Sequence, residues 1–234
     1  PVTVGDFVWE DLDADGIQDD GEPGLAGVSV TLRDAAGNAV SGPVTTGADG
    51  AYGFTVAPGT YWVQFEGQAG YEFSPALQGG NPAHDSDGPD SAPVTLTSGQ
   101  SDLTIDAGLY QPVTVGDFVW EDLDADGIQD SDEPGLAGVS VTLRDAQGNA
   151  VSGPVTTGAD GAYGFTVAPG TYWVQFGGWA GYEFSPALQG GDPARDSDGP
   201  NSAQVTLASG QSDLTIDAGL YQAVTVGDFV WEDL

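Results

Sequence analysis

Hydrophobic and polar residues alternate with a period of two along several short stretches of this chain. Between residues 27 and 33, the apolar side chains of Val28, Val30 and Leu32 are separated by polar ones, and residues 60–66 show the same alternation. In a strand, alternate residues point to opposite faces of the sheet, so this pattern is typical of strands with one buried face. The sequence therefore predicts sheets that bury one side against a core.

Clusters of Gly, Pro, Asn and Asp separate these stretches, as expected for short strands joined by tight turns, and helix signals are missing. We predict seven strands in the first half of the chain. Four are predicted at 3–9, 27–33, 39–46 and 60–66, and the other three are marked by residues that they carry: Tyr52, Phe54 and Val56; Val94 and Leu96; Leu103 and Ile105. Seven short strands of this kind predict an all-β fold, an immunoglobulin-like β-sandwich.

The sequence repeats itself with a period of 111 residues. Only ten positions differ between residues 1–111 and 112–222, and residues 224–234 begin a third copy. Such self-similarity at a fixed period indicates a tandem array. We therefore predict two sandwich domains, 1–111 and 112–222, followed at 223–234 by the first strand of a truncated third repeat. We expect the chain to be a piece of a longer array.

A twelve-residue acidic loop follows the first predicted strand of each copy. It matches the calcium-loop pattern D-x-D-x-D-G-x-x-D-x-x-E from Asp11 to Glu22, and again from Asp122 to Glu133. Ca²⁺ takes six to eight oxygens, so the pattern needs converging carboxylates at positions 1, 3 and 5, a backbone carbonyl at position 7 and a Glu that reaches back at position 12. Position 6 is glycine because the chain turns sharply there.

Asp-Gly-rich segments also form plain solvated turns, but six specified positions met in order in both copies favour a metal site. The residues on either side of the loop read as strands, so a helical EF-hand is not expected. The loop is instead predicted to be mounted between β-strands.

A second acidic motif lies in the long segment 67–91, which exceeds the usual length of a connection in a compact domain. It reads Asp-Ser-Asp-Gly and places carboxylates at Asp85 and Asp87, with Asp196 and Asp198 in the second copy. This motif is compatible with a second calcium site and equally with an Asx-rich turn. If consecutive strands run antiparallel, this segment and the first acidic loop emerge at the same end of the sandwich, and Asp106 lies close enough to join them.

Composition narrows the possible partners. The chain has no lysine, three arginines and 36 acidic residues, with a formal net charge of −33. Such a charge excludes nucleic acid and anionic membranes as partners. There is no cysteine, so disulfides and thiolate metal sites are excluded, and no apolar run is long enough to cross a membrane.

The motifs taken in order carry a resemblance to a known family. The run Val-Gly-Asp-Phe-Val-Trp, the acidic loop, and then Gly-Val-Ser-Val-Thr-Leu, Asp-Ser-Asp-Gly and Asp-Ala-Gly-Leu-Tyr occur in both copies. This combination resembles the B repeats of staphylococcal serine–aspartate-repeat surface proteins. The resemblance implies calcium-binding β-sandwiches of the collagen-adhesin B-type fold, which act as stalks of surface adhesins.

The resemblance also implies two sets of calcium ligands. In the first repeat these are Asp11, Asp13, Asp15, the Ile17 carbonyl, Asp19 and Glu22. In the second they are Asp122, Asp124, Asp126, the Ile128 carbonyl, Asp130 and Glu133. We extend this to a further site at Asp85 and Asp87, with Asp196 and Asp198. Collagen-adhesin B-type domains often carry a lysine isopeptide crosslink, which a chain without lysine cannot form, so bound metal is the main reinforcement left.

The sequence is compatible with two classes of function and speaks against a third. The first is a calcium-rigidified spacer that holds an adhesive domain away from a bacterial surface. The second is a carbohydrate- or protein-binding module that uses aromatic rings. Strand alternation places Trp62 and Trp173 away from the core, and Trp179 replaces Gln68 in the second copy. An enzyme is not expected, because the only histidine, His84, is replaced by Arg195 in the second copy.

The expected partners are calcium ions and neighbouring repeats of the same chain, without nucleic acid or membrane insertion. No heptad pattern or large apolar run indicates an oligomer, so a monomer is expected. The resemblance implies an extracellular protein on the bacterial cell surface.

Overall fold

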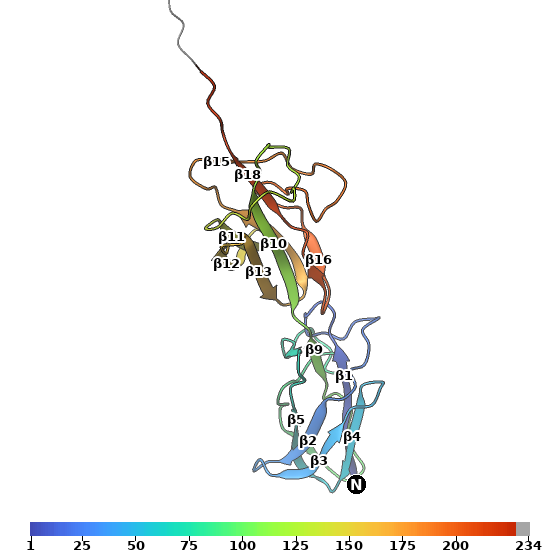
Figure 1. Cartoon of the computed structure of the whole chain (residues 1–234). Helices are drawn as coiled ribbons and strands as arrows, with labels where there is room; N and C mark the ends of the chain where they lie inside the picture. The colour runs from blue at the N-terminus through green and yellow to red at the C-terminus, as the bar shows by residue number, and fades with distance from the viewer. Residues whose placement is uncertain (228–234) are drawn as a thin grey trace, which may run out of the picture. The chain divides into compact units, whose positions relative to one another are not determined.

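The computed structural model of the chain describes residues 1–227, and these contain strands and turns but no helix (Figure 1). The strands form two tandem sandwich-like domains, so the predicted all-β class is confirmed. Within the described residues, no helix has the length and apolar character needed to cross a membrane. Most of the predicted strand at 223–234 lies outside the described residues, and residues 223–227 belong to no strand.

The first repeat contains nine strands rather than seven. They are β1 (Val2–Glu10), β2 (Ser29–Asp34), β3 (Ala39–Thr45), β4 (Ala51–Val56), β5 (Gly59–Phe65), β6 (Glu72–Phe73), β7 (Val94–Leu96), β8 (Ser101–Asp102) and β9 (Ala107–Tyr110). Two short strands account for the difference. Strand β6 lies inside the segment predicted as a long loop, and the predicted last strand is split into β8 and β9.

Two sheets face each other in this repeat. One has the strand order β4-β1-β9-β6, with β8 also paired to β1, and the other has the order β3-β2-β5-β7. Strand β1 runs antiparallel to β4 but parallel to both β8 and β9. The first and last strands of the repeat are therefore neighbours in one sheet and run in the same direction.

The core lies between the two sheets and comes from the alternating positions of the sequence. Val4 and Val8 on β1, Leu32 on β2 and Val63 on β5 are all wholly buried. The Tyr52 ring packs edge-to-face on Phe65 with centroids 5.5 Å apart, a favourable geometry for aromatic pairs. The predicted inward faces of 27–33 and 60–66 are thus correct.

The last strand is interrupted at Leu103–Asp106, and a side chain there replaces the missing backbone hydrogen-bond acceptor. Asp106 Oδ1 accepts a hydrogen bond from the Phe7 backbone N–H of β1 at 3.0 Å. A buried N–H left without a partner would destabilise the sheet, and the Asp106 carboxylate prevents this. The prediction that Leu103 and Ile105 belong to a strand is wrong, because both residues lie in this interruption between β8 and β9, where Leu103 is 50% exposed.

The second repeat has the same topology. Its strands are β10 (Val113–Glu121), β11 (Ser140–Asp145), β12 (Ala150–Thr156), β13 (Ala162–Val167), β14 (Gly170–Phe176), β15 (Tyr182–Phe184), β16 (Val205–Leu207), β17 (Ser212–Asp213) and β18 (Ala218–Gln222). The sheet orders are β13-β10-β18-β15, with β17 paired to β10, and β12-β11-β14-β16. The domain limits 1–111 and 112–222 stay predictions.

Close packing at Gly108 yields the first prediction. A Cβ at Gly108 would lie 2.7 Å from Cζ2 of the wholly buried Trp9 ring. The double variant Gly108→Ala with Gly219→Ala should therefore lose about 1–3 kcal/mol of unfolding free energy per repeat, measured by urea titration. The matched control is Gly80→Ala with Gly191→Ala, where the added Cβ meets no atom within 4 Å. Equal urea midpoints for the two variants would contradict this account of the packing.

Candidate metal centre

The first acidic loop is closed at its base by backbone hydrogen bonds. Strand β1 ends at Glu10, whose N–H donates to the Pro23 carbonyl at 2.9 Å, and Trp9 forms an isolated bridge with Gly24. The two ends of the loop therefore leave and rejoin the sheet side by side. Its residues are held in a compact ring without help from a helix on either side.

Glycine is required at the tip of this ring. Gly16 has φ of +81°, in the left-handed region, and a Cβ there would collide with the Pro75 carbonyl oxygen. Gly127 has the same conformation and the same close approach to Pro186 in the second repeat. The sharp turn predicted for position 6 is thus present, and it is packed against the segment 67–91.

The aspartates at positions 1, 3 and 5 come together in the first repeat. Oxygens of Asp11, Asp13 and Asp15 lie within 4.8 Å of one another. Asp11 is wholly buried, and its Oδ2 accepts a hydrogen bond from Gly16 N–H at 2.9 Å. Its Oδ1 is buried without a hydrogen-bond partner among residues 1–227. A buried carboxylate oxygen of this kind is costly unless something positive meets it.

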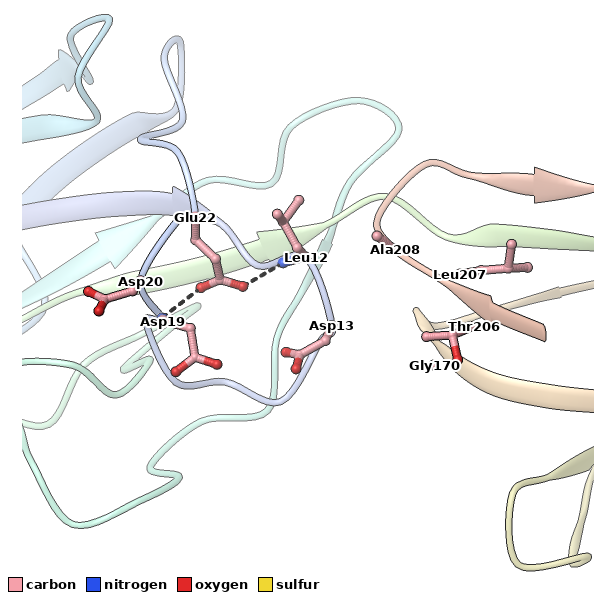
Figure 2. Close-up of a pocket in the computed structure, with 10 residues that line it drawn as sticks. Leu12, Asp13, Asp19, Asp20, Glu22, Gly170, Thr206, Leu207 and Ala208 are labelled. Atoms are coloured by element: carbon pink, nitrogen blue, oxygen red, sulfur yellow. Dashed lines mark hydrogen bonds between the residues drawn. The ribbon is translucent and has the colours of Figure 1, made fainter. Parts of the chain in front are cut away.

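Glu22 closes the loop from its far end. Its Oε1 accepts from Leu12 N–H at 2.7 Å and its Oε2 from Asp19 N–H at 3.0 Å, and Figure 2 shows the side chain turned inward between them. Burial, with smaller effects of Asp11 and Asp13, raises the pKa of Glu22 to about 7. In the second repeat Glu133 makes the equivalent bonds and lies in one cluster with Asp122 and Asp124.

The remaining predicted ligands lie at the edge of the clusters or outside them. Asp19 and Asp130 belong to neither cluster, and Asp126 belongs to none in the second repeat. The Ile17 N–H donates to Asp15 Oδ1 at 2.7 Å, and in the next peptide unit, which contains the position-7 carbonyl, the Gln18 N–H donates to the His84 carbonyl at 2.7 Å. The loops thus gather positions 1, 3 and 5 in one copy and positions 1, 3 and 12 in the other.

The second acidic motif lies directly beside the first loop. Ile17 and Asp85 form an isolated antiparallel bridge, in which Gln18 N–H donates to the His84 carbonyl at 2.7 Å and Ser86 N–H to the Gly16 carbonyl at 3.0 Å. Ile128 and Asp196 form the same bridge in the second repeat. The structure therefore places the two motifs together, as the direction of the strands predicted.

Asp87 turns away from this bridge towards the last strand. Its N–H donates to the Asp106 carbonyl at 2.7 Å, and its Oδ2 accepts from Asp106 N–H at 3.0 Å. Asp106 is almost wholly buried, and its Oδ2 has no hydrogen-bond partner within the described part of the chain. Asp87 is thus paired with Asp106 by its backbone and its side chain.

Burial governs the protonation of this pair. It raises the pKa of Asp106 to about 8, with a smaller contribution from Asp6, and the pKa of Asp87 to about 6. Asp217 and Asp198 repeat these shifts in the second domain, where Asp117 takes the place of Asp6. Asp6 was not among the predicted ligands; the signal that could have found it is an acidic residue in the middle of the otherwise apolar strand β1.

The tryptophans are less available than strand alternation suggested. Trp62 is half-buried, its indole N–H donates to the Asp34 carbonyl, and the Arg33 guanidinium lies 5.7 Å from the ring centroid. Trp173 is covered in the same way by Arg144. Trp179 is 38% exposed. Among the tryptophans of residues 1–227, only Trp179 therefore offers an open ring.

The donor set fits a hard cation. It consists of carboxylates and backbone carbonyls, the oxygen ligands that Ca²⁺ and Mg²⁺ prefer, and it contains no thiolate or imidazole. Asp11 and Asp106 each hold a buried oxygen without a partner among residues 1–227. No lysine exists in the chain to neutralise these groups. A bound divalent cation would supply the missing positive charge.

Comparison with known proteins agrees with the repeat structure. The family profile described as the SdrD B-like domain matches residues 2–109 and 113–220. The chain is 43% identical over 236 residues to serine-aspartate repeat-containing protein F of Staphylococcus epidermidis, covering 98% of this chain and 13% of that protein. It is 40% identical over 236 residues to serine-aspartate repeat-containing protein D of Staphylococcus aureus strain Newman, covering 98% of this chain and 18% of that one.

A solved structure also aligns along the chain. GBS52, a minor pilin of Streptococcus agalactiae, matches with 12% identity and a TM-score of 0.38, covering 98% of this chain and 99% of its own. The curated relatives are much longer than this chain, which spans less than a fifth of either. The family match itself covers both repeats almost completely, and so the chain belongs to the SdrD B-like domain family, with two copies of the domain in tandem.

Proposed function

We propose that each repeat is a calcium-rigidified spacer in the stalk of an extracellular bacterial surface protein. The observation that carries this proposal is the buried carboxylate of Asp11, which sits at the base of a loop built to the calcium pattern and has an oxygen without a partner within the described residues. A group of this kind is stable when a cation completes its surroundings. Calcium then becomes part of the fold rather than a substrate.

The proposed primary ion is held by the loop ligands of each repeat. These are Asp11, Asp13, Asp15, the Ile17 carbonyl, Asp19 and Glu22, with Asp122, Asp124, Asp126, the Ile128 carbonyl, Asp130 and Glu133 in the second repeat. Positions 1, 3 and 5 are already gathered in one copy. For Glu22 to bind through both oxygens, its side chain must exchange the hydrogen bonds to Leu12 and Asp19 for the ion.

A second cation site is proposed around Asp87 and Asp198. In the first repeat, the hydrogen bonds between Asp87 and Asp106 and the proximity of Asp6 favour these three carboxylates, with Asp85 at the neighbouring bridge. This extends the motif Asp85 and Asp87, with Asp196 and Asp198, to carboxylates from the first and last strands. An ion here would join β1, β9 and the segment 67–91.

Electrostatics explains why the ion should matter for stiffness. Two like charges 4 Å apart repel by about 1 kcal/mol in bulk water and by about 4 kcal/mol near a protein surface. Several such pairs compete with a net stability of only about 5–15 kcal/mol for a domain. Bound calcium converts this repulsion into attraction and fixes the loop to its neighbours, as a spacer requires.

We propose no catalytic role, since the single histidine is not shared by both repeats. A carbohydrate-binding role is also less favoured, because Arg33 and Arg144 cover the rings of Trp62 and Trp173. As a spacer, the chain is proposed to act as a monomer whose partners are calcium ions and neighbouring repeats.

Calcium binding is directly testable. Calorimetry on the metal-free chain should show at least one Ca²⁺ per repeat, and calcium at a thousandfold excess over Kd should add about 4 kcal/mol of stability per site. The variant Glu22→Gln with Glu133→Gln should weaken the loop sites at least about tenfold. The matched control, Glu72→Gln with Glu183→Gln, changes exposed residues outside the loops and should bind as the parent does. A chain whose melting temperature is unchanged by EDTA would refute the proposal.

The pH dependence of stability should differ between the metal-free and the calcium-bound protein. In the metal-free protein, burial raises the pKa values of Glu22, Asp87 and Asp106 to about 7, 6 and 8. The unfolded values are near 4, so between about pH 4 and 8 the folded state holds more protons than the unfolded chain. Stability is therefore highest at the acidic end of this window and falls as pH rises through it.

Urea midpoints in EDTA at pH 5, 6.5 and 8 should thus decline, whereas saturating calcium, which favours the ionised carboxylates, should remove the decline. The variant Asp106→Asn with Asp217→Asn keeps an oxygen that can accept from Phe7 or Phe118 and should flatten the EDTA profile. A flat profile in the parent chain would show that these groups do not titrate as described.

The spacer proposal also predicts resistance to tension. Because β1 and β9 run parallel, pulling on the two ends of a repeat loads their hydrogen bonds together, in shear. Single-molecule stretching should give two unfolding steps, each releasing roughly 350 Å of chain for a repeat of about 108 residues. Forces should be higher in calcium than in EDTA. Equal unfolding forces in calcium and in EDTA would mean that calcium does not contribute to the mechanical resistance of the repeat.

A further inference from the structure

A groove opens beside the second acidic motif in each repeat. Its volume is about 440 Å³ in the first repeat and about 300 Å³ in the second, and equivalent residues line both. Its lining combines apolar residues, among them Leu77, Pro82 and Val94, with the acidic residues Asp85, Asp87 and Asp102.

The apolar part of the lining presents a leucine to solvent. Leu77 is 69% exposed, and its counterpart Leu188 is 70% exposed. The backbone holds this side chain in place: Leu77 N–H donates to the Ser86 carbonyl at 2.8 Å, and φ is 57°, a conformation that is uncommon for a bulky residue. The leucine is therefore fixed on the rim of the groove rather than free to fold into the core.

The acidic part of the lining has no positive counterpart. Asp102 is anchored, since its Oδ1 accepts from Thr104 N–H at 3.2 Å and from Thr104 Oγ1 at 2.7 Å. Asp213 and Thr215 make the same contacts in the second repeat. Neither arginine nor histidine lines either groove as the structure describes them. The groove thus combines fixed apolar contacts with a carboxylate, Asp102 or Asp213, that lies outside the proposed calcium site.

We propose that this groove is a docking site for lysine or arginine side chains of a basic partner polypeptide. The long stem of a lysine or arginine is apolar and its head is cationic, so one side chain satisfies both parts of the lining. The stem would pack on Leu77 and Val94 while the head lies against Asp102, the carboxylate of the groove that is not a proposed calcium ligand. Two grooves per chain allow a partner with several basic residues to bind at two points, with a gain in avidity.

The occupant is not a second copy of this chain. The sequence contains no lysine, and its net charge of −33 makes two copies repel each other. Arg33 and Arg144 are bound to Gln64 and Gln175 within their own repeats, and the third arginine, Arg195, forms an ion pair with Asp192 at 3.9 Å. Charge complementarity therefore selects a different, basic protein.

The test uses the whole chain in saturating calcium at about 0.15 M salt, where long-range attraction between exposed charges is screened. The probe is a fluorescent peptide of four Leu-Lys pairs. We expect two peptides per chain by calorimetry, together with shifts of the Leu77 and Leu188 methyl signals in NMR spectra. Acetylating the lysines of the peptide should abolish binding.

Asp102→Asn with Asp213→Asn should weaken peptide binding at least tenfold. These residues are not proposed calcium ligands, and asparagine keeps an oxygen for Thr104 and Thr215. The matched control, Asp49→Asn with Asp160→Asn, removes the same charge from exposed turns and should change binding less than twofold. An equal loss of affinity in both variants would mean that the peptide responds only to the overall charge of the chain. Unshifted methyl signals of Leu77 and Leu188 would mean that the peptide binds outside the groove. Either result overturns the proposal. Self-association of the chain through the groove would overturn it as well.

Discussion

The structure depends on holding negative charge where little positive charge exists. Each repeat buries the carboxylates of Asp11 and Asp106, or of Asp122 and Asp217, in a chain with three arginines and no lysine. A buried charge must be neutralised by a proton, a partner or a metal. Below neutral pH, protons neutralise the carboxylates of Glu22 and Asp106, because burial raises their pKa values to about 7 and about 8. Above it, the cation that we propose would supply the positive charge, and this would link the stability of the fold to the ions around it.

The same carboxylates connect parts of the repeat that are far apart in sequence. Asp106 bonds to Phe7, 99 residues away, and so completes the ladder between the first and last strands. The bridge between Ile17 and Asp85 ties the acidic loop to the long segment that follows β5. Neutralising one cluster therefore stabilises several elements at once. Ion binding and folding should accordingly behave as one cooperative event in each repeat.

Many strand positions, their buried faces and the acidic loop could be predicted from the sequence, because each depends on a local pattern of residues. The alternation in 27–33 and 60–66 gave the buried faces, and four predicted strands agree with β1, β2, β3 and β5 to within two residues at each end. The twelve-residue pattern predicted that Asp11, Asp13 and Asp15 come together, while the ion that they bind stays a prediction. The family match confirms the resemblance that the motifs carried. Local patterns succeed here because period and spacing alone decide them.

The remainder depends on contacts that no local pattern records. The proximity of Asp6 to Asp106 arises only when the first and last strands meet, and the contact of Asp106 with Asp87 only when the long segment joins them. The split of the last strand follows from a side chain that replaces a backbone acceptor at Phe7, and alternation continues through the break without marking it. The cover that Arg33 places on Trp62 is likewise a contact between strands.

The parallel pairing of β1 with β9 has a consequence for how such chains change over generations. Because the first and last strands complete each other, the repeat is a closed module, and a break inside it would leave Phe7 and Asp106 without their partners. Gene duplication or deletion is therefore tolerated in whole units of 111 residues. The ten positions that differ between the copies are nearly all exposed, so such units can drift on their surfaces while remaining interchangeable. The reach of a protein built from them would grow or shrink in fixed steps, set by recombination rather than by redesign of the fold.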